Sequence, residues 1–159
     1  MNMEIIDIKQ IDEANLIHFF EEECGGNRMV VSSGDYVLSE SPGFVAFEKG
    51  IIQGAVTYSI SKGKLELVSL NSRIENQGIA TRLINQVKQT AQEYNIKTLC
   101  VTTTNENIKA MLFYQKRGFR FSEIIVDAVT KTRKLKPSIP LYSEQGIPIH
   151  DEIVFVLQL

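Results

Sequence analysis

Alternating and continuous apolar segments, separated by short polar turns, recur along this chain and predict a protein rich in β-strands. Each apolar segment is bounded by residues such as Gly, Asn, Ser or Pro, which end strands and form turns. The predicted strands cover residues 3–8, 44–48, 51–60, 65–70, 99–103, 119–129 and 152–159. Turns at Lys49-Gly50 and Lys62-Gly63 indicate that three of these strands form an antiparallel meander.

Apolar residues at helical spacing predict three helices between these strands. They cover residues 11–24, 79–94 and 105–117. In the second helix, apolar side chains recur at every fourth position from Ile79 to Ala91, so one face is expected to be buried. Residues 28–43 hold clusters of Ser, Gly and Pro, which predict loops with one short helix or strand. Residues 131–136 are mostly Lys or Arg and predict a solvated surface segment, with a patch that binds anions as the alternative.

The order of these elements predicts the fold class. The helix between the strands at 65–70 and 99–103 carries the chain back across the sheet, so these two strands must run parallel. The meander strands, joined by short turns, are expected to run antiparallel. We therefore expect an α/β fold: a mixed, mostly antiparallel central sheet with a parallel central pair and helices on both faces. The length of 159 residues fits a single domain that covers residues 1–159.

Composition and charge argue against several functions. The net charge of −2 leaves no basic footprint for nucleic acid, and no apolar run approaches the roughly 20 residues of a membrane span. Cys24 and Cys100 form neither a disulfide framework nor the spacing of metal ligands, so no metal is expected. The first residues lack the basic and apolar pattern of a signal peptide, and we expect a cytoplasmic protein.

The turn at residues 76–80 stands between the strand at 65–70 and a long amphipathic helix. It delivers unpaired backbone N–H groups at the head of this helix, where the helix dipole favours an anion such as a phosphate. The small residues Gly78 and Ala80 let a ligand approach the backbone closely. Small residues also occur at helix starts for packing reasons, so both interpretations stay open at this point.

Two motifs in this region resemble signatures of the GNAT superfamily of N-acyltransferases. Gly78-Ile79-Ala80, followed by Leu83-Ile84, is similar to the acetyl-coenzyme A signature Q/R-x-x-G-x-G/A and the helix after it. Residues 107–119 match the second signature, N-x-x-A-x-x-x-Y-x-x-x-G-F, at the family's usual separation. The resemblance covers about residues 44–125. In one departure, Glu75 replaces the Gln or Arg of the signature, and its carboxylate would oppose a pyrophosphate by about 1 kcal/mol in solvent.

The resemblance implies the GNAT fold and acetyl-CoA as co-substrate. Backbone groups of the strand would pair with the pantetheine arm, the turn would bind the pyrophosphate, and an asparagine side chain would hydrogen-bond the arm. The cofactor-binding residues implied in this way are Val68, Ser69, Leu70, Gln77, Gly78, Ile79, Ala80, Thr81 and Asn107. The N–H of Leu70 would polarise the thioester carbonyl, as an oxyanion-hole donor does.

The resemblance also implies catalytic and substrate-binding roles. Tyr114 stands where the family places a general acid, and a phenol beside the sulfur can protonate the departing coenzyme A thiolate. Glu66, the only acid in its strand, stands where many relatives carry a base for the attacking amine. Each has a structural alternative: local packing for Tyr114 and an exposed strand face for Glu66. Phe20 and His150 lie in segments that often line the acceptor site in this family.

The sequence thus predicts an acetyltransferase that moves an acetyl group from acetyl-CoA to a primary amine by direct attack, with tyrosine as general acid. The expected acceptor is a small-molecule or peptide amine, and the resemblance suggests a homodimer. Neither nucleic acid nor a membrane is expected as a partner. The alternative is a non-catalytic module that binds or senses acyl-CoA, which the carboxylate of Glu75 keeps open.

Overall fold

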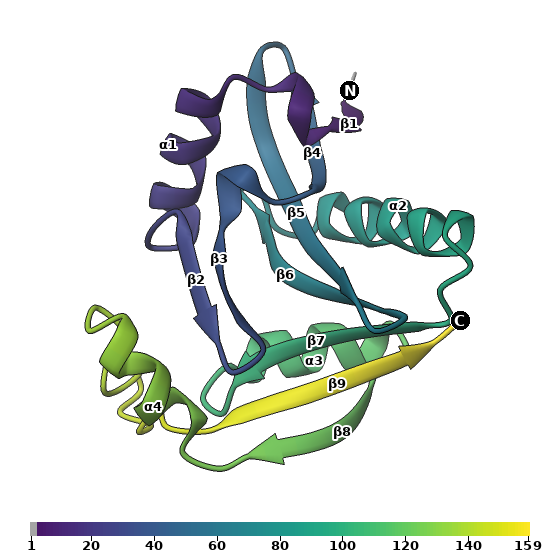
Figure 1. Cartoon of the computed structure of the whole chain (residues 1–159). Helices are drawn as coiled ribbons and strands as arrows, with labels where there is room; N and C mark the ends of the chain where they lie inside the picture. Colours follow the sequence, from purple (N-terminus) through teal and green to yellow (C-terminus); the bar gives the residue numbers. More distant parts are fainter. Residues whose placement is uncertain (1–2) are drawn as a thin grey trace. The chain divides into compact units, whose positions relative to one another are not determined.

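The computed structural model describes residues 3–159, and Figure 1 shows their strands and helices in chain order. Its strands are β1 (Glu4–Asp7), β2 (Arg28–Val31), β3 (Gly34–Val37), β4 (Gly43–Glu48), β5 (Ile51–Ser61), β6 (Lys64–Ser72), β7 (Thr98–Thr104), β8 (Arg120–Ile125) and β9 (Glu152–Gln158). Its helices are η1 (Ile8–Gln10), α1 (Glu13–Glu23), η2 (Leu38–Glu40), α2 (Ile79–Glu93), α3 (Ile108–Lys116) and α4 (Ala128–Leu135).

The strands of the larger sheet follow the order β1-β4-β5-β6-β7-β9-β8, and β2 and β3 form a second, two-stranded sheet. Four pairs are antiparallel: β1–β4, β4–β5, β5–β6 and β8–β9. Helix α2 carries the chain from β6 to its neighbour β7, and this pair is parallel, as a helical crossover requires. The predicted fold class is confirmed: a mixed, mostly antiparallel sheet with a parallel pair.

The chain divides into two compact units, each described by itself. Unit 1 comprises the described residues up to 29, residues 36–99 and residue 159. Unit 2 comprises residues 30–35 and 100–158.

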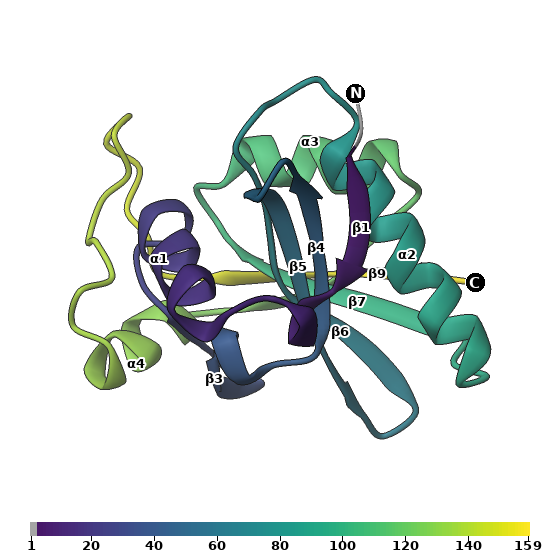
Figure 2. The same ribbon diagram turned by 90° about the horizontal axis from the view of Figure 1, so that it is seen from above.

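In unit 1, α1 and α2 cover opposite faces of β4 and β5, as Figure 2 shows. Val45 and Ala55 belong to the core beneath α1, together with the fully buried Phe19 of that helix. On the other face, Gly54 lies against the first turn of α2, and a Cβ atom there would come within 2.8 Å of Ile79 Cγ2. The predicted arrangement of helices on both faces of the sheet is therefore present in this unit.

Helix α2 buries the apolar stripe that its sequence predicts. The four residues at successive fourth positions are each at most 1% exposed: Ile79, Leu83, Val87 and Ala91. With 15 residues, α2 is longer than the other helices, and no helix within residues 3–159 is long and apolar enough to cross a membrane. The buried stripe fixes α2 on the sheet and leaves its N-terminal end at the surface.

Strand β6 carries one residue more than β5 at one point of their pairing. The register steps from the pair Thr57–Ser69 directly to the pair Tyr58–Leu67. Val68 is therefore an extra residue on β6 and forms a β-bulge. A bulge turns local backbone groups out of the regular ladder, and this one lies within the strand that precedes the turn at 73–78.

In unit 2, α3 packs against β9 through aromatic rings. The ring centroid of Tyr114 lies 5.3 Å from that of Phe119 and 6.2 Å from that of Phe155. Phe155 is fully buried, and its ring also lies 4.6 Å from the ring of Phe121 on β8. These contacts hold the second signature helix on the strands of its own unit.

Residues 119–129 do not form a single strand, so this prediction is wrong in its second half. Strand β8 ends at Ile125, Asp127 adopts a left-handed conformation with φ of 60°, and α4 begins at Ala128. Ala128 and Thr132, four residues apart, are both buried, which favours a helix that packs one face inward. The predicted basic surface segment lies largely within this helix.

Residues 28–43 contain more regular structure than predicted, because they form β2, β3 and η2. At the turn between the two strands, the N–H and hydroxyl of Ser32 donate to the carboxylate of Glu152 at 3.0 and 2.6 Å. These bonds give partners to a carboxylate that is only 1% exposed. A contact between residues so far apart in the chain leaves no local signal in the sequence.

Candidate functional site

The N-terminus of α2 presents its backbone to the surface. Gly78 is the N-cap residue, with φ of 73°, and has no side chain that could cap the helix amides. Asn76 also has a positive φ of 61°, and residues 73–78 are exposed. The N–H groups of the first turn are therefore directed to a place where the helix dipole favours an anion.

The space beside Gly78 distinguishes it from a glycine required by packing. A Cβ atom built at Gly78 would meet no atom of residues 3–159 within 4 Å, apart from those of Gly78 and its two chain neighbours. At Gly54, by contrast, a Cβ atom would come within 2.9 Å of the backbone oxygen of Asn71. The packing interpretation thus applies to Gly54, whereas the open turn at Gly78 fits a phosphate group, which needs close approach to the backbone.

Two arginines flank this turn, and their surroundings differ. Arg73 Nη1 lies 2.7 Å from Glu22 Oε2 and 3.3 Å from Glu23 Oε1. The hydrogen bond from Arg73 is the main cause that lowers the pKa of the Glu22 carboxyl. Arg82 Nη2 donates to the backbone carbonyl of Met3 at 3.3 Å.

The predicted base, Glu66, lies on the face of β6 that α1 covers. Glu66 stands opposite Ser59 and Ser69 stands opposite Thr57, so the bulge between them places both on one face. Ala55 of the core beneath α1 lies on this same face of β5. The hydroxyls of Thr57 and Ser69 share a buried hydrogen bond of 2.6 Å. Glu66 itself is half-buried, and its role as a base stays a prediction.

Phe20, a predicted substrate contact, lies in the core instead of at the surface. It has no exposed area, and its ring packs edge-on against Phe19 with 5.6 Å between centroids. Both rings belong to the core beneath α1. We therefore leave Phe20 out of the proposal below.

Asn107 begins α3, and the oxygen of its side chain is engaged in the helix. Oδ1 accepts the backbone N–H of Ala110 at 3.1 Å and so caps α3. A contact from this side chain to a ligand would therefore come from the Nδ2 amide, which is a donor. The predicted contact with the coenzyme A arm stays compatible with this geometry.

Tyr114 is 7% exposed and lies among aromatic rings, with Phe113 5.3 Å away between centroids. Burial raises the pKa of its phenol well above the ordinary value of about 10. The phenol is therefore protonated at neutral pH, which is the form that a general acid requires. The contacts with neighbouring rings explain why an aromatic side chain occupies this position. The role of the Tyr114 hydroxyl as a general acid stays a prediction.

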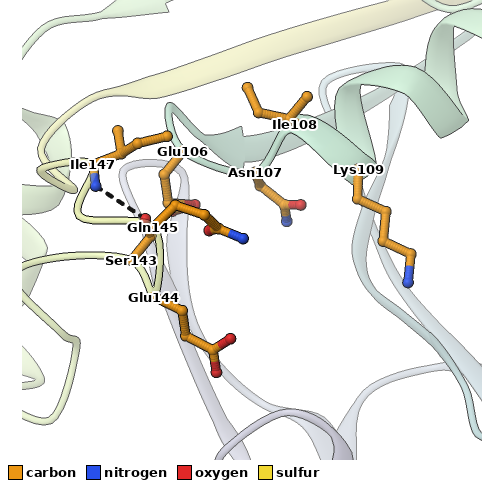
Figure 3. A pocket seen from close by; sticks show the side chains of 8 residues that line it. All are labelled: Glu106, Asn107, Ile108, Lys109, Ser143, Glu144, Gln145 and Ile147. Carbon is orange, nitrogen blue, oxygen red and sulfur yellow. Dashed lines mark hydrogen bonds between the residues drawn. The ribbon is translucent and has the colours of Figure 1, made fainter.

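A surface pocket of about 540 Å³ lies in unit 2, between the start of α3 and the loop before β9. The residues that line it are Glu106, Asn107, Ile108, Lys109, Ser143, Glu144, Gln145 and Ile147 (Figure 3). The hydroxyl of Thr104 holds the carboxylate of Glu106 by a hydrogen bond. The loop is closed by a 3.1 Å bond from the N–H of Ile147 to Ser143 Oγ, dashed in Figure 3.

His150 lies just after this loop, and sequence reasoning missed its partners. Its Nδ1 lies 2.8 Å from Oδ2 of Asp151, whose other oxygen accepts the N–H of Asp127 at 2.8 Å. The side chains of Asp127, His150 and Asp151 each place a nitrogen or carboxylate oxygen atom within 4.8 Å of the others. The two hydrogen bonds account for this short separation. Side chains of adjacent residues on an extended chain usually point apart, so this contact cannot be read from the sequence.

The predicted site residues fall into two groups, one in each unit. Unit 1 holds Glu66, Val68, Ser69, Leu70, Gln77, Gly78, Ile79, Ala80 and Thr81, along β6 and the head of α2. Unit 2 holds Asn107, Tyr114 and His150. Apart from the carboxylate of Glu66, the first group offers backbone amides, and the second offers the side chains of Asn107, Tyr114 and His150.

Comparison with known proteins supports the two motifs. A family model described as "Acetyltransferase (GNAT) domain" matches residues 11–127. The protein YxbD of Bacillus subtilis is 40% identical over 158 residues, 99% of each chain. YdhI of the same organism is 43% identical over 154 residues, 96% of each chain. The chain therefore belongs to the GNAT acetyltransferase family.

Solved structures share this fold at low sequence identity. An IAA acetyltransferase from Bacillus cereus has a TM-score of 0.71 at 22% identity, over 99% of this chain and 98% of that one. A GNAT family acetyltransferase from Elizabethkingia anophelis with acetyl-CoA bound has a TM-score of 0.66 at 24% identity, over 77% and 78%. The ribosomal-protein-S18-alanine N-acetyltransferase from Escherichia coli has a TM-score of 0.69 at 13% identity, over 98% and 93%.

Proposed function

We propose that the protein is an acetyl-CoA-dependent N-acetyltransferase whose acceptor is a primary amine of a small molecule or peptide. The observation that carries this proposal is the open head of α2 at Gly78, whose geometry suits the pyrophosphate of coenzyme A. Membership of the GNAT family and a solved relative with acetyl-CoA bound support it.

Coenzyme binding is proposed along β6 and the turn that follows it. The backbone of Val68–Leu70 pairs with the pantetheine arm as an added strand would, and the bulge at Val68 supports this by releasing backbone groups from the ladder. The amides of Gln77–Thr81 bind the pyrophosphate. Asn107 donates to the arm from Nδ2, because its Oδ1 caps α3.

The chemistry follows from the groups that this chain supplies. Acetyl-CoA, when bound, provides an activated thioester carbonyl. The N–H of Leu70 polarises the carbonyl oxygen as an oxyanion-hole donor. Tyr114 gives its proton to the sulfur as negative charge develops there, which makes the thiolate a better leaving group. Glu66 is one candidate for the base that deprotonates the attacking amine, on the ground of the family resemblance alone.

Replacing Tyr114 by Phe tests the proposal, because it keeps the ring contacts and removes the acidic proton. We expect kcat to fall about 100-fold, while the Kd for acetyl-CoA stays unchanged. Thiol release from acetyl-CoA with a panel of primary amines measures the rate, and calorimetry measures the Kd. Tyr94→Phe, at the exposed C-terminal end of α2, is the matched control and should retain both values.

Three other outcomes are informative. Full turnover in Tyr114→Phe would show that another group protonates the thiolate. Binding of acetyl-CoA without thiol release in the wild type, whatever the amine, would support the alternative of a non-catalytic acyl-CoA sensor. Lack of binding would contradict both functions.

A further inference from the structure

A histidine and an aspartate at the start of β9 form a hydrogen-bonded pair of defined polarity. His150 Nδ1 lies 2.8 Å from Asp151 Oδ2, and the imidazole is 43% exposed. An ionised carboxylate can only accept hydrogen bonds, so Nδ1 must carry the proton of this bond. The lone pair of a neutral imidazole then lies on Nε2, which is the tautomer that a general base needs.

The backbone around this pair is fixed from two neighbouring elements. Oδ1 of Asn105, at the end of β7, accepts the N–H groups of both His150 and Asp151 at 3.0 Å. The carbonyl of His150 accepts the N–H of Val129 on α4 at 2.9 Å. The carboxylate is held by the N–H of Asp127 at 2.8 Å. Such second contacts preorganise a catalytic side chain, whereas a surface ion pair does not require them.

The backbone of the pair is tied through Asn105 to the two segments that line the pocket in unit 2. Asn105 directly precedes Glu106, and its Nδ2 donates to the carbonyl of Pro148 at 2.8 Å, beside Ile147. Asn105 therefore connects the pair to both segments that line the pocket. The lining includes the carboxylates of Glu106 and Glu144 against a single ammonium group, so it favours a cationic ligand (Figure 3).

We propose that this pocket binds a cationic primary amine and that His150 is the general base that deprotonates it, with Asp151 and Asn105 as positioning residues. This proposal rests on the acetyl transfer proposed above. Nε2 takes one proton from the ammonium group, and the freed lone pair attacks the thioester carbonyl carbon. The C–S bond breaks, the sulfur leaves with the electron pair and takes a proton from Tyr114, and the nitrogen gives its second proton to the Tyr114 phenolate.

Charged groups of both signs lie near His150. The carboxylates of Asp151 and Asp127 belong to the same cluster. On α4, the guanidinium of Arg133 donates to the carbonyl of Ile149 at 2.7 Å and opposes them in part. The N–H of Asp127, followed by the His150 side chain, lowers the pKa of Asp151, so its carboxylate stays ionised through the neutral range.

The first test is the pH dependence of kcat/KM for the amine of the panel that reacts fastest. In the wild type we expect the rate to rise with pH through the range in which an imidazole loses its proton. His150→Gln should lower kcat/KM about 100-fold and remove this rise, with the acetyl-CoA Kd unchanged. His18→Gln is the matched control, because the chain's other histidine also pairs with a carboxylate, Glu22, at 2.6 Å. It should keep the full rate.

The second test needs no acceptor and reads the tautomer of His150 by ¹⁵N NMR. We expect the proton on Nδ1 in the wild type and a shift toward the Nε2 tautomer in Asp151→Asn. A proton on Nε2 in the wild type would overturn the proposal. So would a rise with pH that persists in His150→Gln, or one that is lost in Glu66→Gln instead. Failure of the proposed function looks different, because no amine would then release thiol from acetyl-CoA in the wild type.

Discussion

At the scale of single residues, two glycines have different structural roles. Gly54 lies against α2 and leaves no room for a side chain, whereas Gly78 caps the same helix beside open space. The sequence predicted Gly78 at the start of a helix. It could not show whether this glycine is required by close packing or by a bound ligand, because that depends on the surrounding atoms. Tyr114 and Asn107 were predicted by their motif, while Asp151 was missed because its contacts come from the tertiary fold.

Glu75 yields a prediction at this scale. Its carboxylate lies three residues before Gly78, in the turn proposed to bind pyrophosphate. Glu75→Gln should tighten acetyl-CoA binding up to about fivefold at low salt, since one repulsion of about 1 kcal/mol is removed. Calorimetry at two salt concentrations measures it, and the gain should shrink as salt screens the charge. Glu93→Gln, at the opposite end of α2, should change nothing, and an unaltered Kd in Glu75→Gln would contradict the proposed location of the pyrophosphate.

At the scale of secondary structure, periodicity predicted the elements that have a strong pattern of their own. Helix α2 has a buried stripe at every fourth position, and the meander has clear turn signals. The hairpin of β2 and β3 and helix α4 were missed because both are short and depend on distant partners. Ser32 forms hydrogen bonds with Glu152, which is distant in the sequence. Helix α4 begins shortly after β8, and no Gly or Pro between them marks a turn.

Helix α4 stabilises the loop before β9, a role that its basic composition did not predict. Arg133 donates to the carbonyls of Ile139, Pro140 and Ile149 at 3.1, 2.8 and 2.7 Å, and so holds both ends of the loop that lines the pocket. A lysine cannot donate in the geometry of the planar guanidinium to all three carbonyls. Arg133→Lys should therefore lower the free energy of unfolding by about 2 kcal/mol.

Urea denaturation measures this loss, with Arg120→Lys on the exposed side of β8 as the control. If the pocket binds the amine, Arg133→Lys should also raise the KM for the amine and leave the Kd for acetyl-CoA unchanged. A loss of stability no larger than that of the control would contradict the role of Arg133.

At the scale of the whole molecule, buried phenols link folding stability to pH. Burial raises the pKa of both Tyr114 and Tyr58 above the ordinary value. Below about pH 10 both phenols are protonated in the folded and unfolded states, and their contribution to stability is complete. Above this value the unfolded chain releases protons that the folded chain retains, so the free energy of unfolding must fall as pH rises.

Urea denaturation between about pH 8 and pH 11 should show this decline beginning near pH 10. Tyr114→Phe should make the decline shallower, because one of the two linked protons is removed while the ring contacts remain. Tyr58→Phe should act in the same direction. An identical decline in the wild type and in both variants would contradict the link between these buried phenols and alkaline stability.

The most direct test of the central claim is the thermal stability of the purified protein with and without acetyl-CoA. At about 100 times its Kd the ligand should add about 2.7 kcal/mol to the free energy of unfolding. Gly78→Ala should lose most of this gain, because the added Cβ enters the space that the pyrophosphate would occupy. Gly63→Ala is the matched control, with φ of 75° and open space around its Cβ, and should keep the gain after the same backbone strain of about 1 kcal/mol. An absent shift in the wild type, or an equal shift in Gly78→Ala, would contradict acetyl-CoA binding at the head of α2.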